Sequence, residues 1–119
     1  MNRKTVLIVE DDEEIRSSVA DVLEFEGFVV HTTTNGLDAL RWLRGGVFPD
    51  IILLDMMMPV MDGWQFIREL RKNHPQNAMP VVIFSAYGNP RAMAEELDVA
   101  GYLRKPFSVD ELMAAIQSA

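Results

Sequence analysis

The sequence predicts an α/β fold, a doubly wound parallel sheet of five strands in the flavodoxin-like (βα)5 arrangement. Three short apolar runs, at residues 6–9, 51–54 and 81–84, are rich in β-branched side chains and are flanked by polar or turn residues. Such runs are typical of central strands covered on both faces. Segments with helical spacing follow them, and this alternation of strand and helix favours right-handed crossovers between parallel strands.

The length and composition fit one globular domain over residues 1–119. Hydrophobic residues make up 49% of the chain and charged residues 24%, so a domain of this length should fold alone. The chain has no cysteine, which excludes disulfides, thiol catalysis and cysteine-ligated metal sites. It has no signal-peptide pattern and no long apolar run, so we expect a cytoplasmic protein without membrane contact. The net charge of −7 argues against direct nucleic-acid binding, which needs clustered Lys and Arg.

Two more polar segments, at residues 29–33 and 101–104, are predicted to form the edge strands, where one side of the sheet meets solvent. With the three apolar runs in the centre, the strand order is 2-1-3-4-5. The order reverses between strands one and three. Ligands of such sheets bind at the carboxyl ends of the strands beside that point.

The first two helices are predicted from apolar residues at helical spacing. The first ends at Gly27, and the second starts at Asn35 and stops at Gly45 and Gly46. Their buried faces consist of Ile15, Val19, Val22 and Leu23 in the first helix and of Leu37, Leu40 and Leu43 in the second.

The other three helices carry stronger start signals. Asp62 is the predicted N-cap of the third helix, with Gln65 three residues later as in a capping box. Asn89 is the predicted N-cap of the fourth, because the following Pro90 suits the first helical position. The fifth opens with a capping box at residues 108–111. The buried stripe of the third helix consists of Phe66, Ile67 and Leu70.

Acidic side chains follow strands one and three, the two strands beside the reversal point. Glu10, Asp11 and Asp12 come directly after the first strand, and Asp55 comes directly after the third. Carboxylates that converge in this way raise one another's pKa or demand a cation, and an all-oxygen surface site suits Mg²⁺. Asp12 and Glu13 have a simpler explanation, because acids are favoured at a helix N-terminus. That explanation does not cover Asp55, which precedes a loop.

A hydroxyl and an ammonium are expected at the same edge of the sheet. Strand four ends in Ser85 and Ala86, and strand five ends in Lys105 and Pro106. Either polar side chain alone would be weak evidence, since strand ends are commonly polar. Together with the acids at the neighbouring strand ends, they outline a phosphoryl-binding site.

Over essentially its whole length, the chain resembles the receiver domains of two-component response regulators. Several independent motifs carry the resemblance, and they occur in the same order as in the family. They are Val-Glu-Asp-Asp at residues 9–12, Leu-Asp-Met-Met-Met-Pro-Val-Met-Asp-Gly at 54–63, Ser-Ala at 85–86 and Gly-Tyr-Leu-Arg-Lys-Pro-Phe at 101–107.

The resemblance implies that Asp55 is the phosphorylation site and the catalytic nucleophile. It would accept a phosphoryl group from a phosphohistidine of a partner kinase and form an acyl phosphate. Glu10 and Asp11 would hold Mg²⁺, for which Mn²⁺ can substitute, together with Asp55 and the backbone carbonyl of Met57. The only catalysis implied is of the protein's own phosphorylation and dephosphorylation.

The resemblance also assigns the contacts of the phosphoryl group. Lys105 would contact one phosphoryl oxygen and the Ser85 hydroxyl another, so that both offset the charge of the transferring group. Ala86 would leave room for the group to approach backbone amides, and Met56 would be a further contact. Lys105 is expected to compete with nothing in the cation's shell. Its bond to Pro106 is cis in the family, and we expect the same here.

A conformational switch is the expected output of this resemblance. When Ser85 is drawn to the phosphate, Tyr102 would swing inward and change the surface around strand five and helices four and five. The expected partners are a sensor histidine kinase or phosphotransfer protein, and a downstream effector or an output domain outside this chain. Phosphorylation-dependent dimerisation is left open. So is the choice between a complete single-domain regulator and the receiver of a longer protein.

The chain departs from the family pattern before and within the fourth helix. Ser85 and Lys105 are 20 positions apart, about two fewer than expected for the family, so we predict a short or displaced fourth helix. The two residues that flank the path of an attacking water in the family are here Met57 and Tyr87. Met57 is apolar and Tyr87 is bulky, so the approach of water should be obstructed. Neither offers a carboxylate or amide to activate water, so slow self-dephosphorylation is expected.

Two other classes of protein compete with this interpretation. A haloacid-dehalogenase-like phosphatase uses the same groups but has a second aspartate two residues after the nucleophile, where this chain has Met57. A flavodoxin-like binding module without phosphoryl chemistry would need a glycine-rich or hydroxyl-rich loop after strand one, and would leave the acids unexplained. Incubation with a small phosphodonor and Mg²⁺, followed by mass measurement, separates the three.

Overall fold

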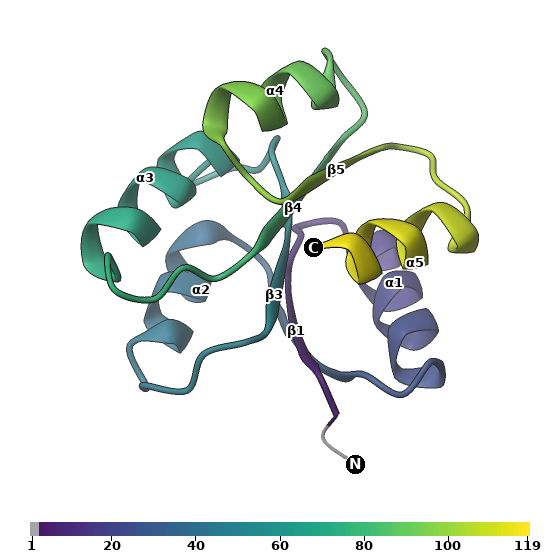
Figure 1. Cartoon of the computed structure of the whole chain (residues 1–119), viewed down its shortest axis with the longest axis horizontal. Helices are drawn as coiled ribbons and strands as arrows, with labels where there is room; N and C mark the ends of the chain where they lie inside the picture. The colour runs from purple at the N-terminus through teal and green to yellow at the C-terminus, as the bar shows by residue number, and fades with distance from the viewer. Residues whose placement is uncertain (1–2) are drawn as a thin grey trace.

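The computed structural model describes residues 3–119. Within these residues, five parallel strands form one sheet in the order β2-β1-β3-β4-β5, and five helices connect and follow them (Figure 1). The predicted fold class and strand order are confirmed. In chain order the elements are β1 (Thr5–Val9), α1 (Glu13–Phe25), β2 (Val29–Thr33), α2 (Gly36–Leu43), β3 (Ile51–Asp55), α3 (Gly63–Asn73), β4 (Val81–Ser85), α4 (Pro90–Leu97), β5 (Gly101–Arg104) and α5 (Val109–Ser118).

The sheet separates two hydrophobic cores. Helices α2, α3 and α4 cover one face, and α1 and α5 cover the other (Figure 1). Side chains alternate along each strand, so Leu7 and Val9 of β1 pack in the first core, while Val6 and Ile8 pack in the second. Both faces of β3 and β4 are covered, which explains why these strands read as unbroken apolar runs.

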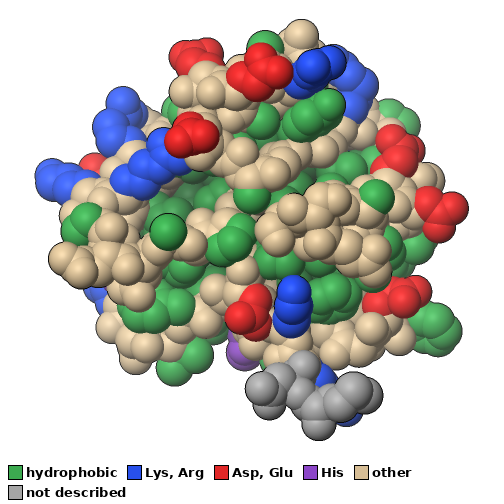
Figure 2. Space-filling view, viewed as in Figure 1, with side chains coloured by type: hydrophobic (Ala, Val, Ile, Leu, Met, Phe, Trp, Pro, Cys, Tyr) green, Lys and Arg blue, Asp and Glu red, His purple; other side chains and the backbone are tan. Residues whose placement is uncertain are grey.

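The edge strands and the outer faces of the helices carry the polar residues. In β5, Leu103 is buried against α5, whereas Tyr102 and Arg104 are exposed. Figure 2 shows one face of the molecule, on which most charged side chains lie near the outline and hydrophobic side chains are visible across the middle. None of the helices in residues 3–119 is long and apolar enough to cross a membrane.

The predicted helix starts are present as capped helix N-termini. Asp12 caps α1 by accepting a hydrogen bond from the Ile15 amide at 3.0 Å. This agrees with the simpler explanation of Asp12 as an acid favoured at a helix N-terminus. Capping boxes open α3 and α5, and Asn89 caps α4. Two details differ by one residue, because β3 includes Asp55 and α2 begins after Asn35, its cap. Helix α4 has only eight residues, in line with the shortened segment before Lys105.

Candidate functional site

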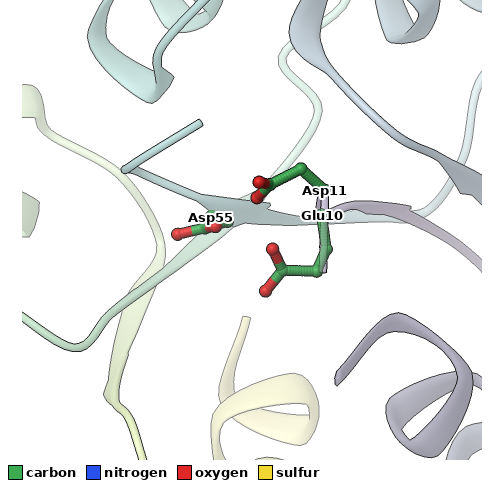
Figure 3. Close-up of side chains that lie close together, drawn as sticks. All are labelled: Glu10, Asp11 and Asp55. Carbon is green, nitrogen blue, oxygen red and sulfur yellow. The ribbon is translucent and has the colours of Figure 1, made fainter. Parts of the chain in front are cut away.

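Three carboxylates meet at the carboxyl ends of β1 and β3. The register pairs Val9 with Leu54, so Glu10 and Asp11 follow β1 at the level where Asp55 ends β3. Ligand oxygens of these three acids lie within 4.8 Å of one another, and Figure 3 shows the side chains gathered at the two strand ends. Glu10 has no exposed surface and Asp55 is 3% exposed, whereas Asp11 faces solvent. Over residues 3–119 this is the one acidic or histidine cluster able to hold a metal ion.

The ammonium of Lys105 is the counter-ion of the two buried acids. Its Nζ lies 2.7 Å from Oε1 of Glu10 and 3.4 Å from Oδ2 of Asp55, and also 4.8 Å from the centre of the Phe84 ring. The expectation that Lys105 competes with nothing in a cation's shell is therefore wrong. Glu10 would have to share its charge between the ammonium and a bound cation.

Burial and mutual repulsion shift the titration of two of the acids. Burial raises the pKa of the Glu10 carboxyl, the adjacent Asp55 carboxyl raises it further, and Lys105 lowers it in part. Partial desolvation of its carboxyl group and the neighbouring Glu10 raise the pKa of Asp11. The site is thus short of positive charge, as expected for carboxylates arranged to receive a cation.

The donor set fits Mg²⁺ on chemical grounds. All three side chains offer carboxylate oxygens, which are the ligands that this hard cation prefers. One ammonium stands against three carboxylates, so a divalent cation would offset the remaining repulsion. The exposed Asp11 lies on the solvent side, where a cation that keeps several waters can enter.

The loop after Asp55 is shaped by backbone contacts. The Met57 amide donates to Oδ1 of Asp55 at 3.1 Å, while the Met57 side chain is 52% exposed. Met56 is fully buried, and its amide donates to the Phe84 carbonyl at 3.2 Å, so in this conformation the amide is occupied by the sheet. Gly63 is required behind it, because a Cβ there would lie 2.8 Å from the Met56 Cα.

Ser85 is buried beside this cluster but is hydrogen-bonded elsewhere. Its Oγ donates to the Tyr87 carbonyl at 2.9 Å and accepts from the Tyr87 amide at 3.2 Å. Ala86 is exposed and, with Lys105, borders a groove of about 520 Å³ next to α1. Tyr102 is 44% exposed on β5. The peptide bond that follows Lys105 is cis.

Arg16 is a residue of the site that sequence reasoning missed. From α1, its Nη1 donates to the backbone carbonyls of Glu10 at 3.0 Å and Asp11 at 3.3 Å. Arg16 thereby holds the turn that carries two of the three acids. No signal in the sequence marks this contact, because it depends on where a long side chain of the helix folds back.

The comparisons with known proteins decide the family. The family of response regulator receiver domains matches residues 6–117. This chain is a member of that family. The receiver domain is 38% identical over 115 residues to the transcriptional regulatory protein CpxR of Klebsiella pneumoniae, covering 95% of the chain and 47% of CpxR. It is 34% identical to the regulatory protein AtoC of Escherichia coli, covering 96% of the chain and 24% of AtoC. The chain thus spans about half or less of these relatives.

Solved structures agree with this assignment. The chemotaxis protein CheY4 of Vibrio cholerae superposes with a TM-score of 0.87 at 28% identity, and the match covers 98% of each chain. The receiver domain of the Francisella response regulator 1452 superposes with a TM-score of 0.83 at 31% identity, covering 98% and 96%. The predicted family is confirmed, and receiver domains of this family are signalling switches of two-component systems.

Proposed function

We propose that this receiver domain, residues 1–119, accepts a phosphoryl group on Asp55 in a Mg²⁺-dependent reaction. The observation that carries the proposal is the setting of the Asp55 carboxylate. It is almost fully buried beside the acids Glu10 and Asp11, and its Oδ2 lies 3.4 Å from the ammonium of Lys105. A nucleophile in such a setting has a cation site and a fixed positive charge at hand to offset the charge of a phosphoryl group.

The proposed donor is a phosphohistidine of a sensor kinase or phosphotransfer protein. An oxygen of the Asp55 carboxylate forms a bond to phosphorus while the bond from phosphorus to the imidazole nitrogen breaks. The electron pair of that bond leaves with the nitrogen, so a ring protonated at its other nitrogen departs as neutral histidine. The cation site would consist of Glu10, Asp11, Asp55 and the Met57 carbonyl. Mg²⁺ held there, or Mn²⁺ in its place, would neutralise charge on the phosphoryl oxygens.

The remaining site residues would bind the transferred group. Lys105 would turn from Glu10 toward a phosphoryl oxygen, and Ser85 would give up its hydrogen bond to Tyr87 and donate to another oxygen. The exposed Ala86 leaves space beside the site, and Met56 would supply a contact once its amide leaves the sheet.

The proposed output is a change of the surface formed by β5, α4 and α5. Movement of Ser85 would open space for the Tyr102 ring to turn inward, and a downstream effector or an output domain would read the new surface. The domain would act in the cytoplasm and catalyse only its own phosphorylation and dephosphorylation. A phosphorylation-dependent dimer is one form that this output can take.

Intact-mass measurement tests the proposal. Incubation with acetyl phosphate and Mg²⁺ should add one phosphoryl group, and phosphoramidate should serve as well because it carries a phosphorus–nitrogen bond. Asp55→Asn and EDTA should each abolish the adduct, while Asp21→Asn, a change to an exposed acid of α1, should not. An adduct that persists in Asp55→Asn, or that forms fully in EDTA, would overturn the assignment.

A further inference from the structure

Arginine side chains from neighbouring elements hold both ends of α4. At the carboxyl end, Arg71 of α3 donates to the carbonyls of Leu97 and Asp98. At the amino end, Nη2 of Arg104, the last residue of β5, donates to the Gly88 carbonyl at 2.7 Å. Helix α4 is only eight residues long, so these two contacts fix both of its ends to the rest of the domain.

The contact at the amino end acts on the loop that also binds Ser85. This β4–α4 loop comprises residues 86–89. The Ser85 hydroxyl bonds to both backbone groups of Tyr87, and Arg104 bonds to the next carbonyl, that of Gly88. Gly88 has φ 71°, a left-handed conformation that glycine adopts without strain. The hydroxyl and the guanidinium therefore stabilise the same short turn.

The position of Arg104 links the two residues expected to switch. In the register of β4 with β5, Arg104 is the direct partner of Ser85. Along β5, Arg104 lies two residues after Tyr102, and both are exposed while Leu103 between them is buried. Alternation places Tyr102 and Arg104 on one face of the strand.

We propose that Arg104 is a positioning residue that keeps the β4–α4 loop in its unphosphorylated arrangement and so opposes phosphorylation of Asp55. The inference rests on the proposed function. Ser85 can donate to a phosphoryl oxygen only after it releases the Tyr87 carbonyl. A contact that holds the loop in place before phosphorylation, and must change afterwards, shifts the equilibrium toward the unphosphorylated state. A charge-assisted hydrogen bond is among the stronger contacts of this kind.

Three alanine variants distinguish an effect on the β4–α4 loop from a general loosening of α4 and from the loss of a positive charge near α4. Arg104→Ala removes the contact in question. Arg71→Ala removes the equivalent contact at the far end of α4, and Arg91→Ala removes a positive charge from the exposed first turn of the same helix. Amide exchange of Tyr87 in the unphosphorylated protein reports loop opening, and the rate of phosphorylation by acetyl phosphate with Mg²⁺ reports readiness to react.

We expect Arg104→Ala to increase both rates by about threefold to tenfold, the worth of one hydrogen bond whose charge is screened because Arg104 is exposed, with little change in either control. Equal rates in Arg104→Ala and the unchanged protein would overturn the inference, as would the same gain in Arg71→Ala or Arg91→Ala. Faster loop opening without faster phosphorylation would also overturn it. If the unchanged protein takes up no phosphoryl group at all, both the proposed function and this inference are wrong. That result differs from the ones above, in which the protein is phosphorylated but Arg104 does not affect the rate.

Discussion

Nζ of Lys105 lies 2.7 Å from Oε1 of Glu10, a carboxylate without exposed surface. The two residues are 95 positions apart and come from the ends of β1 and β5, on opposite sides of β3 and β4. The ammonium reaches across these strand ends to occupy part of the acid site. The same lysine is therefore the counter-ion of the site before phosphorylation and the proposed partner of the phosphoryl group after it.

Replacing Lys105 by methionine should separate cation binding from phosphorylation. Without the ammonium, Glu10 no longer divides its charge, so the Mg²⁺ affinity should stay the same or rise a few-fold. Phosphorylation by acetyl phosphate should slow at least tenfold, because a fixed positive charge is lost. Fluorescence of Trp64, half-buried at the start of the helix beside the Asp55 loop, measures the Mg²⁺ titration. The exposed Lys72→Met is the control, and weaker Mg²⁺ binding with phosphorylation intact would contradict the prediction.

The stabilisation of the fold by Mg²⁺ should increase with pH. The raised pKa values of Glu10 and Asp11 mean that the metal-free fold retains protons that the unfolded chain has already released. Their contribution to stability is present at low pH and is lost as pH rises through the raised pKa values. Mg²⁺ competes with these protons, so its effect should grow above the usual glutamate value of 4.5.

Thermal unfolding with and without Mg²⁺ between pH about 4.5 and 8 checks this dependence. Asp11→Asn should raise the metal-free stability at neutral pH by less than about 1 kcal/mol, because solvent screens this exposed side chain. It should also weaken the effect of Mg²⁺. A Mg²⁺ shift of the same size at every pH would count against the raised pKa values.

Local signals in the sequence were enough for the fold and for the location of the acids. Apolar runs located the central strands, polar caps located the helix starts, and the rule for strand ends brought Glu10 and Asp55 together. The contacts of Arg16 and Arg104 with backbone carbonyls could not be predicted in this way. Each joins a flexible side chain to the backbone of a turn outside its own helix or strand, and neither periodicity nor residue type records such a contact.

Val60 has a backbone conformation that is unfavourable for valine. Val60 follows Pro59 in the loop after Asp55 and has φ 70°, a region that β-branched residues rarely adopt. Its side chain is 76% exposed, so little packing is lost on its removal. We expect Val60→Gly to raise the free energy of unfolding by about 1 kcal/mol. This is the difference between about 2 kcal/mol of strain relieved at a left-handed non-glycine residue and about 1 kcal/mol for the freedom that glycine adds to the unfolded chain.

Val109→Gly is the matched control for this change. Val109 is 49% exposed and lies in the first turn of α5, where glycine should destabilise by about 1 kcal/mol through the greater freedom of the unfolded chain. Denaturant unfolding of both variants measures the two changes, which should have opposite signs. Destabilisation by both would show that the strain at Val60 is smaller than the cost of the freedom that glycine adds to the unfolded chain.

The lifetime of the proposed acyl phosphate depends on how water reaches phosphorus. The two flanking side chains, Met57 and Tyr87, are 52% and 70% exposed, so they extend into solvent and physical obstruction is not the main barrier. The main barrier to hydrolysis is then a chemical one, because a thioether and a phenol are poor bases for activating water. We therefore still expect slow loss of phosphate without a phosphatase.

A time course of phosphate release, read by intact mass, tests this expectation. Met57→Asn combined with Tyr87→Glu places an amide and a carboxylate beside the path of water. This pair should speed hydrolysis by about tenfold or more, less than the roughly hundredfold at which the range for a well-positioned general base begins. Met57→Leu combined with Tyr87→Phe alters the same positions without adding a base and should leave the rate nearly unchanged. If that apolar pair speeds hydrolysis to the same extent, the gain of the first pair does not come from an added base. If neither pair speeds hydrolysis, water is oriented by groups other than these two.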